Sequence, residues 1–427
     1  MSKLHPKSPN PKSNNGENQV KSGDSAELKI IFLTVFIYLI GFGMVLPLIP
    51  MISREFGASP IATGWLLSIY SIMQFIFSPL WGRLSDRIGR RPILLFCLAG
   101  EVVAYIIFAF SKNLEMLFIS RALSGFFGAS ISTASAYISD ITPSSGRTKG
   151  MALIGAAFGL GFVLGPAIGG GLSLLAQKNG NTSPYLALQM VGLTVALFCL
   201  GTFIFALLRL REPARRHEVD RVTSRWTRIK GYIFKRPVNI PLIVYLLVGV
   251  GMAAMEATLV LYMADYFDWG LKETSFGFAY VGLSMAFTQG FLVRKLVPKW
   301  GEAKILTFSL ILFAIGMAGI PATSYLLVIG LSMTLLAVGI GLSNSSLLGV
   351  ISLLSPSDSQ GEALGVAQSF SSLGRILGPL IGGFLYSIYN PGPFIFAAVI
   401  GLLCWILIIL NKSIIPQSGK VESAVNS

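Results

Sequence analysis

Four ionisable side chains lie deep inside long apolar stretches of the sequence: Glu101, Arg121, Glu256 and Arg375. A charged group in such surroundings is costly and usually functional. Burial also favours the neutral form of a carboxyl group, which can then take up and release a proton. These residue types in this setting indicate proton transfer, ion pairing or the binding of a charged ligand.

Each of these residues has more than one interpretation. At 1.5 Å per residue, Glu101 and Arg121 lie ~6 Å apart in depth, a gap that a long arginine can bridge. Arg121 either controls the protonation of a nearby acid or is a structural arginine bonded to backbone carbonyls. Glu256 and Glu101 either carry protons or have packing, snorkelling or lipid-facing roles. Arg375 either contacts an anionic ligand or pairs with an acid such as Glu256, and Asp265 is expected to be solvated near the surface.

No other cluster of reactive residues is visible in the sequence. Cys97, Cys199 and Cys404 each lie inside an apolar run, where a thiol packs as a small hydrophobic group. His5 and His217 lie far apart in polar segments. Because neither metal-ligand spacing nor a nucleophile–base pattern occurs, we expect no metal, no cofactor and no enzyme.

The composition points to a membrane. The 427 residues are 53% hydrophobic and only 12% charged, with a mean hydropathy of +0.70. Soluble proteins carry about 25% charged residues, which excludes a soluble enzyme, a nucleic-acid-binding domain and a disulfide scaffold. About 20 apolar residues cross a bilayer. We therefore expect an all-α membrane protein with twelve transmembrane helices, at 30–52, 61–82, 92–110, 115–138, 150–175, 185–208, 240–262, 274–296, 303–320, 325–350, 362–388 and 393–411.

The basic residues predict the orientation. With the N-terminus inside, 27 of the 33 lysines and arginines fall on the inner side and four on the outer side. Cytoplasmic loops carry this excess, so both termini are predicted to be cytoplasmic, in a multi-pass protein of the cell membrane. Ten cations lie in the loop 209–239, which is expected to rest on anionic lipid headgroups and not to bind nucleic acid. The expected parts are a disordered tail at 1–28, a half at 29–208, the basic linker at 209–239, a half at 240–411 and a tail at 412–427.

An internal repeat relates the two halves. Residues 161–170 read GFVLGPAIGG and residues 374–383 read GRILGPLIGG, an offset of 213 without gaps. These segments are the fifth and the eleventh predicted helices, so the chain consists of two six-helix halves in the same orientation. Secondary transporters use this architecture, with a substrate site between the halves and alternating access by rocking.

The loop after the second predicted helix reads GRLSDRIGRRP, from Gly82 to Pro92. Asp86 is spaced for an ion pair with Arg90, and Gly89 permits the turn. This loop resembles the signature loop of the major facilitator superfamily. Residues 117–129 are similar to the buried-arginine motif of that family, and residues 46–50, which read LPLIP, resemble the end of the first helix in its twelve-span drug:proton antiporters, the tetracycline and multidrug exporters.

The resemblance implies roles for several residues. Asp86, Arg90 and Asp140 match a charge network, with Gly82 and Gly89 in the same loop, that latches the outward-open state. Aligning Gly301 with Gly89 places Pro298 opposite Asp86, so only the first half keeps the acid. The repeated segment in the first half is similar to the motif that the superfamily associates with antiporters, and it contains Gly161, Gly165, Pro166, Gly169 and Gly170.

One departure from the family changes the choice of proton carrier. Tetracycline exporters have a carboxylate near the middle of the first helix, whereas Tyr38 lies nine residues before Pro47 and the helix contains no acid. Glu256 and Glu101 are therefore the candidate proton carriers, with Arg121 as the control on protonation.

Polar and methionine side chains suggest a substrate cavity. The same residues could instead hold helices together. The candidates are Tyr38, Ser132, Met252, Met255, Asn344, Gln368 and Arg375.

The sequence predicts a monomeric secondary transporter that exports a small amphipathic or drug-like compound against an inward proton flux. Its expected partners are a small-molecule substrate, protons and membrane lipids. The alternatives are a transporter of the same fold for a sugar, siderophore or lipid, and a receptor or scaffold that does not transport.

Overall fold

The computed structural model of the chain describes residues 22–128, 130–141, 157, 160, 161, 163–173, 175, 184–213, 238–355 and 360–411. Within these ranges the protein is helical and has no strand, as predicted. The first part contains α1 (Ser22–Val45), α2 (Leu48–Glu55), α3 (Pro60–Ile88), α4 (Arg90–Ala109), α5 (Leu114–Gly128), α6 (Ser130–Ile141), a short apolar helix (Val163–Ser173) and α8 (Pro184–Arg209). The second part contains α10 (Asn239–Phe267), α11 (Leu271–Phe287), the π-helical turn η2 (Thr288–Leu292), α12 (Val293–Trp300), α13 (Glu302–Gly319), α14 (Leu326–Leu353), α15 (Gln360–Ile388) and α16 (Gly392–Leu410).

Ten helical segments in the described part of the chain are long and apolar enough to cross a membrane. The helix α15 has 29 residues but is not among the ten, because glycines, serines and Arg375 lower its hydropathy. The segment predicted at 150–175 lies partly outside the described residues. The membrane-spanning helical fold is confirmed, and the number twelve stays a prediction.

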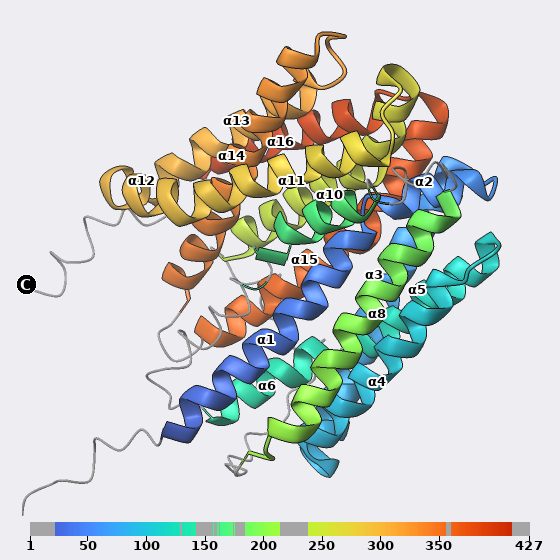
Figure 1. The fold of residues 1–427 in the computed structure, drawn as a ribbon. Coiled ribbons are helices and arrows are strands. Elements are labelled where there is room, and N and C mark those ends of the chain that lie inside the picture. The colour runs from blue at the N-terminus through green and yellow to red at the C-terminus, as the bar shows by residue number, and fades with distance from the viewer. Residues whose placement is uncertain are drawn as a thin grey trace, which may run out of the picture.

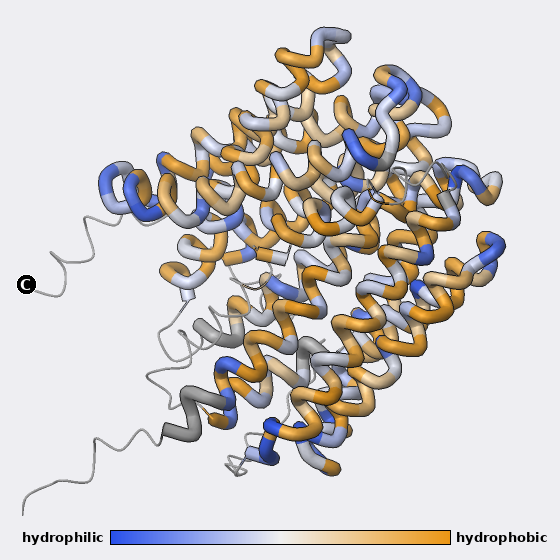
Figure 2. Tube along the Cα trace, viewed as in Figure 1, coloured by the Kyte–Doolittle hydropathy of each residue, from blue (hydrophilic) through white to orange (hydrophobic). Residues whose placement is uncertain are grey.

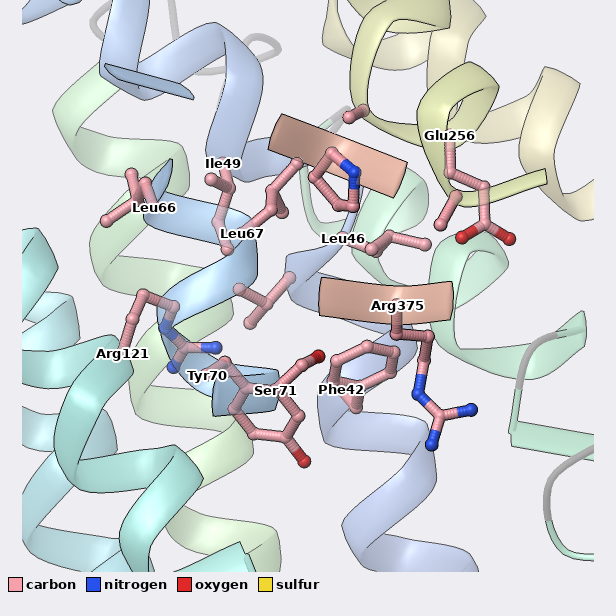
Figure 3. Close-up of a pocket in the computed structure, with 14 residues that line it drawn as sticks. Phe42, Leu46, Ile49, Leu66, Leu67, Tyr70, Ser71, Arg121, Glu256 and Arg375 are labelled. Atoms are coloured by element: carbon pink, nitrogen blue, oxygen red, sulfur yellow. The ribbon is translucent and has the colours of Figure 1, made fainter. Parts of the chain in front are cut away.

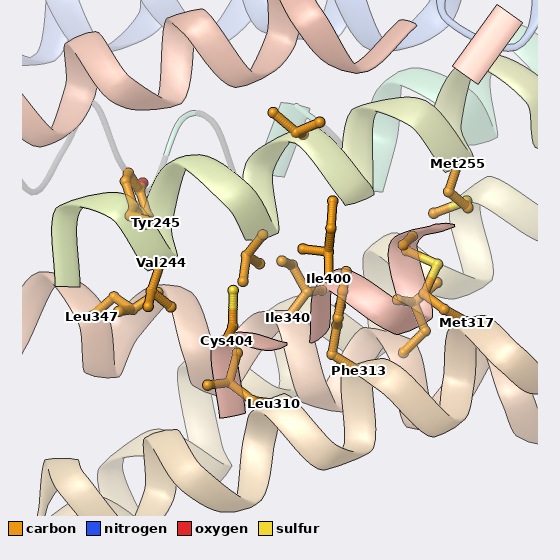
Figure 4. Close-up of a cluster of buried hydrophobic side chains, with 14 of the residues drawn as sticks. Val244, Tyr245, Met255, Leu310, Phe313, Met317, Ile340, Leu347, Ile400 and Cys404 are labelled. Atoms are coloured by element: carbon orange, nitrogen blue, oxygen red, sulfur yellow. The ribbon is translucent and has the colours of Figure 1, made fainter. Parts of the chain in front are cut away.

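Each half has its own apolar core. One buried cluster contains only residues from Val238 to Ile408, and its centre around Phe313 is shown in Figure 4. The larger clusters of the first half contain only residues from Ile30 to Leu210. Because no core cluster of the described residues mixes the halves, each half packs as a unit, and Figure 1 shows them as two groups of helices.

Short sequence signals set the helix ends that matter most for the site. The Ser59 hydroxyl accepts a hydrogen bond from the Ala62 amide at 3.2 Å, and Pro60 begins α3. Gly89 joins α3 to α4 with φ 122°, and Gly301 joins α12 to α13 with φ 75°. Both conformations are difficult for residues with a Cβ atom. The two loops that the repeat relates therefore turn in the same manner.

The repeated glycines bring helices of each half into close contact. A Cβ atom on Gly165 would lie 2.7 Å from backbone atoms of Gly43 in α1, and a Cβ atom on Gly378 would lie 2.7 Å from the Val250 carbonyl oxygen in α10. The same kind of contact thus recurs at the offset of 213. Small residues at such positions let helix backbones approach each other.

The bundle has two distinct ends. We call the end that carries Arg83, Arg87, Lys299 and Lys304 the basic end, and the end that carries Arg54 and Asp265 the opposite end. Figure 2 shows polar residues gathered at both ends, with mostly apolar helices between them. The halves meet where α3 packs along α15 and α2 packs against α10. In Figure 1 the two groups of helices converge near α2 and diverge toward α6 and α12.

A valine at Gly165 or Gly378 is expected to destabilise the protein by about 1–3 kcal/mol, because the added atoms would meet backbone that cannot move aside. Thermal unfolding of the purified protein in detergent measures the effect. The matched control is Gly201→Val, since a Cβ atom there has nothing within 4 Å. Equal unfolding temperatures for all three variants would contradict the packing role.

Candidate functional site

A cavity of about 340 Å³ lies between the two halves. Its walls come from α1 and α3 of the first half and from α10, α11, η2, α14 and α15 of the second. A smaller cavity of about 40 Å³ adjoins it, shares Tyr70, Glu256 and Arg375 with it, and reaches Arg121 (Figure 3). Cavities of 300–1,000 Å³ are typical of small-molecule sites.

Two oppositely charged side chains line the main cavity. Arg375 donates hydrogen bonds to the Ser371 hydroxyl at 3.0 Å and to the Ser372 hydroxyl at 3.2 Å. No carboxylate of the described residues lies within 4.0 Å of its guanidinium group. Glu256 makes no hydrogen bond to any described residue. The predicted pairing of Arg375 with Glu256 is therefore absent from this part of the structure.

Glu101 and Arg121 lie inside the first half, where each is 1% exposed. Neither carboxylate oxygen of Glu101 has a hydrogen-bond partner among the described residues. The guanidinium of Arg121 lies 5.1 Å from the ring centre of Tyr105 and 4.8 Å from that of Phe108, and it donates to Ser124 at 3.1 Å. Aromatic faces stabilise a buried cation. Arg121 is thus held mainly by rings, and no ion pair within 4.0 Å joins it to Glu101.

Tyrosines separate Glu101 from the main cavity. The hydroxyl groups of Tyr38 and Tyr70 are hydrogen-bonded to each other, and Tyr70 lines the cavity. Gln74 donates to the Gly128 carbonyl at 3.1 Å, and a Cβ atom on Gly128 would lie 3.1 Å from the Glu101 Oε1 atom. Tyr38 itself is buried and is not among the described residues that line the cavity, which it reaches only through Tyr70, so its role at the substrate stays a prediction.

Most of the other residues predicted to line the cavity do so. Met252, Met255, Asn344, Gln368 and Arg375 line the main cavity, whereas the side chain of Ser132 lies outside the described residues. Sequence reasoning missed several lining residues because nothing in their local sequence marks them: Gln74, Tyr245, Phe278, Met285, Gln289 and Met333. Gln289 lies in the π-helical turn, a distortion that is frequent at functional sites.

The predicted charge network is present at the basic end. Arg90 contacts Asp86 at 2.5 Å and Asp140 at 2.8 Å, and it donates to the Ser85 hydroxyl at 2.7 Å. That hydroxyl donates to the Gly82 carbonyl at 2.7 Å. All of these groups belong to the first half. Their geometry agrees with a charge network, and their role as a latch remains a proposal.

Glu212 was not predicted and belongs to the same end. Its two carboxylate oxygens accept hydrogen bonds from the backbone amides of Arg90 at 2.6 Å and Arg91 at 2.8 Å. The first amides of a helix need acceptors, and Gly89 supplies no side chain. The sequence indicates that the first amides of α4 need an acceptor, because the helix begins after a glycine. It does not indicate that Glu212, more than 120 residues later, supplies this acceptor.

Polar contacts join the halves at the opposite end. Asp265 forms an ion pair with Arg54 at 2.5 Å and accepts a hydrogen bond from the Tyr386 hydroxyl at 2.7 Å. Toward the middle of the bundle, the Ser68 hydroxyl donates to the Ile376 carbonyl at 2.8 Å. The expectation that Asp265 is merely solvated is wrong, because its carboxylate connects α2 with α10 and α15.

Comparisons with known proteins agree with this architecture. The family model of the Major Facilitator Superfamily matches residues 31–378 and 242–424. The class B tetracycline resistance protein of Escherichia coli is 32% identical over 394 residues, which are 90% of this chain and 95% of that protein. Multidrug resistance protein 1 of Bacillus subtilis (strain 168) is 32% identical over 378 residues, 87% of this chain and 92% of that protein.

Solved structures show the same fold. The crystal structure of the human organic anion transporter MFSD10 (TETRAN) has a TM-score of 0.66 and 24% identity, covering 90% of this chain and 99% of that one. A bacterial homolog to the human lysosomal transporter Spinster, in an inward-facing and occupied conformation, has a TM-score of 0.73 and 15% identity, covering 91% and 97%. At these identities the likeness concerns the fold alone.

The fold, the cavity between its halves and these relatives define a multi-pass membrane transporter for small molecules, and the expectation that the chain is not an enzyme is confirmed. The chain belongs to the major facilitator superfamily.

Replacing Glu212 by alanine is expected to loosen the start of α4, because two backbone amides lose a charged acceptor. A hydrogen bond to a charged group contributes about 1.5–3 kcal/mol, so the amides of Arg90 and Arg91 should exchange hydrogen on the order of ten times faster or more. Hydrogen exchange of the peptide that contains them is the measurement. Glu55→Ala is the control, since Glu55 is exposed at the end of α2; unchanged exchange in Glu212→Ala would refute the cap.

Proposed function

We propose that the protein exports a small amphipathic compound in exchange for protons by alternating access. The observation that carries this proposal is the cavity between the halves, which contains the acid Glu256. Polar contacts join the halves at the opposite end of the bundle. Relatives named for tetracycline and multidrug resistance support the direction of transport.

The charge distribution supports an orientation with the basic end in the cytoplasm. Lysines and arginines gather on cytoplasmic loops, and the topology predicted from the sequence assigns 27 of the 33 to this side. We place the protein as a monomer in the cell membrane with both termini inside. The cavity then faces the cytoplasm, because the halves touch at the opposite end through Arg54 and Asp265 and toward the middle through Ser68 and Ile376.

Glu256 is the better placed of the two candidate proton carriers. Its side chain lines both cavities, so the site that binds substrate can also exchange protons with it. Glu101 is 1% exposed and lies behind tyrosines. We assign the primary coupling role to Glu256. Glu101 and Arg121 act together as a second protonation site that communicates through Tyr38 and Tyr70.

The two motifs keep the roles that the family resemblance implies. Asp86, Arg90 and Asp140 are the proposed latch at the basic end, with Gly82 and Gly89 shaping the loop. The members of the antiporter motif are Gly161, Gly165, Pro166, Gly169 and Gly170. Gly161, Gly165 and Gly169 pack closely against the backbone of α1, whereas Gly170 packs against Ser275 of α11 in the second half.

Transport of a metabolite such as a sugar, siderophore or lipid is the second candidate. It is favoured by one observation, the absence of an acid from the apolar part of α1, where tetracycline exporters have a carboxylate. A receptor or scaffold is disfavoured, because neither needs a charged cavity between two separately packed halves.

Neutralising Glu256 is expected to uncouple transport from the proton gradient. The ligand is first identified by a thermal-shift screen of drugs, sugars and lipids with the purified protein. Its flux is then measured in proteoliposomes with and without an imposed pH gradient. Wild type should respond to the gradient, Glu256→Gln should lose the response, and Glu101→Gln should show a reduced response.

The control for this experiment is Glu55→Gln, which removes an exposed carboxylate far from the cavity and should leave coupling intact. Gradient dependence equal to wild type in both Glu256→Gln and Glu101→Gln would refute the assigned carriers. A sugar, siderophore or lipid as the sole ligand would favour the second candidate.

Replacing Asp265 by asparagine should favour opening of the opposite end, because the ion pair to Arg54 is lost. A partly exposed pair contributes up to about 1 kcal/mol, which corresponds to a shift of about fivefold. The probe is a cysteine in place of Ala257, which lines the small cavity, labelled by an impermeant maleimide from the opposite side. Labelling should be faster in Asp265→Asn, and an unchanged rate would contradict the closing role.

Asp268→Asn is the matched control for that labelling. Asp268 lies at the same end in a left-handed conformation with φ 52°, which asparagine also tolerates. The native cysteines Cys97, Cys199 and Cys404 are buried, and a sample without the added cysteine measures their background.

A further inference from the structure

The main cavity contains few charged groups, and they are of opposite sign. Among its described lining residues, Glu256 is the one carboxylate and Arg375 the one arginine, and no lysine or histidine lines it. The remaining walls are apolar or carry neutral polar groups. The cavity therefore presents one negative and one positive position to any ligand.

Arg375 has donor groups left for a ligand. A guanidinium carries five N–H donors, and its two described hydrogen bonds go to the neutral hydroxyls of Ser371 and Ser372 on its own helix. A guanidinium without a carboxylate partner is costly at membrane depth. An acidic group in the cavity would give it the partner that the described residues do not supply.

The two charges are separated in depth and do not neutralise each other directly. Gly374 packs against Gly249 and Val250, so Arg375 lies at the level of those residues in the neighbouring helix. Glu256 lies six residues beyond Val250 toward the opposite end, ~9 Å at 1.5 Å per residue. Figure 3 shows the same order, with Glu256 toward Leu46 and Ile49 and Arg375 toward Phe42 and Tyr70.

The wall around these charges is adaptable and apolar. Four methionines line the cavity, Met252, Met255, Met285 and Met333, together with Phe278. Methionine side chains have three rotatable bonds and a polarizable sulfur, so they fit apolar bodies of different shape. The volume of about 340 Å³ suits a compound of drug size.

We propose that the cavity selects zwitterionic amphipaths, with a carboxylate or similar acidic group on Arg375, an ammonium group on Glu256 and an apolar body against the methionines. The role of this site in transport rests on the proposed function. In the transport cycle a proton taken up by Glu256 displaces the ammonium group, so the proton and the substrate compete for one carboxylate. Arg375 is not part of that exchange and holds the acidic group in either protonation state.

Three fluorescent dyes with one ring skeleton test the proposal. Rhodamine 110 carries amino groups and a free carboxylate, rhodamine 123 is its methyl ester and lacks the carboxylate charge, and fluorescein keeps the carboxylate but lacks the amino groups. Binding to the purified full-length protein in detergent is measured by fluorescence anisotropy at pH 7. Rhodamine 110 should bind about ten- to a hundredfold tighter than rhodamine 123, which is only cationic, or fluorescein, which is only anionic; this is the range for a charged hydrogen-bonded contact.

Variants assign each charge to its residue. Arg375→Gln should weaken rhodamine 110 to the affinity of rhodamine 123 and leave rhodamine 123 unchanged, and Arg375→Lys should restore part of the preference. Glu256→Gln should weaken both rhodamines and spare fluorescein. Arg294→Gln is the control, because Arg294 is an exposed cation on α12 outside the cavity and should change none of the three affinities.

The wild-type ratio of rhodamine 110 to rhodamine 123 needs no variant, so the test survives if a variant fails to fold. Equal affinities for these two dyes, or an equal loss of both in Arg375→Gln, would overturn the proposal. Binding and coupling are separate readouts: an Arg375-dependent preference without gradient-driven flux would refute the proton antiport and keep the zwitterion site. Proton-coupled flux without the preference would do the reverse.

Discussion

The cost of holding charge away from water is the constraint on which this structure depends. Three arginines of the described chain meet it in three ways. Arg90 at the basic end has two carboxylates, Asp86 and Asp140. Arg121 inside the first half is stabilised by two aromatic faces and a serine. Arg375 has two serines and lines the main cavity, where its remaining N–H donors are available to a ligand.

Contacts of two kinds join the halves. Glycines place the backbones of α3 and α15 against each other, since a Cβ atom on Gly64 would collide with the Pro379 carbonyl oxygen. Partly exposed polar groups at the opposite end, Arg54 and Asp265, form the second kind of contact, which water can replace at small cost. Inside each half the helices pack over an apolar core that belongs to that half, so each half can stay intact while the contacts between the halves change.

The sequence predicts the fold well because its signals are local. Apolar stretches show the spanning helices, and the glycines of the repeat show which helices correspond, since each must admit a neighbouring backbone at close range. The loop around Asp86 indicates the major facilitator superfamily, because its residues match the signature loop of that family. The division at 209–239 falls mostly outside the described residues, so those boundaries stay predictions.

The site is predicted less completely, because side-chain direction and distant partners are not local properties. A helix that is apolar on all sides gives no sign of its rotation, which is why Tyr38 lies behind the cavity wall and Gln74 in it. Glu212 and Asp265 find partners on helices remote in sequence. In the proposed cycle the pairing of Asp265 also changes with the end that is closed, and the sequence alone does not distinguish the two states.

The depth order of the two cavity charges gives the proposed cycle a direction. With the opposite end closed, a ligand that enters from the basic end reaches the level of Arg375 before that of Glu256, which lies ~9 Å further on. When the opposite end opens, water and protons from that side reach Glu256 first. Protonation there removes the attraction for an ammonium group while Arg375 still holds the acidic end. The ligand is then bound at one point instead of two, and a tenfold or greater loss of affinity at this step favours release toward the side that supplied the proton.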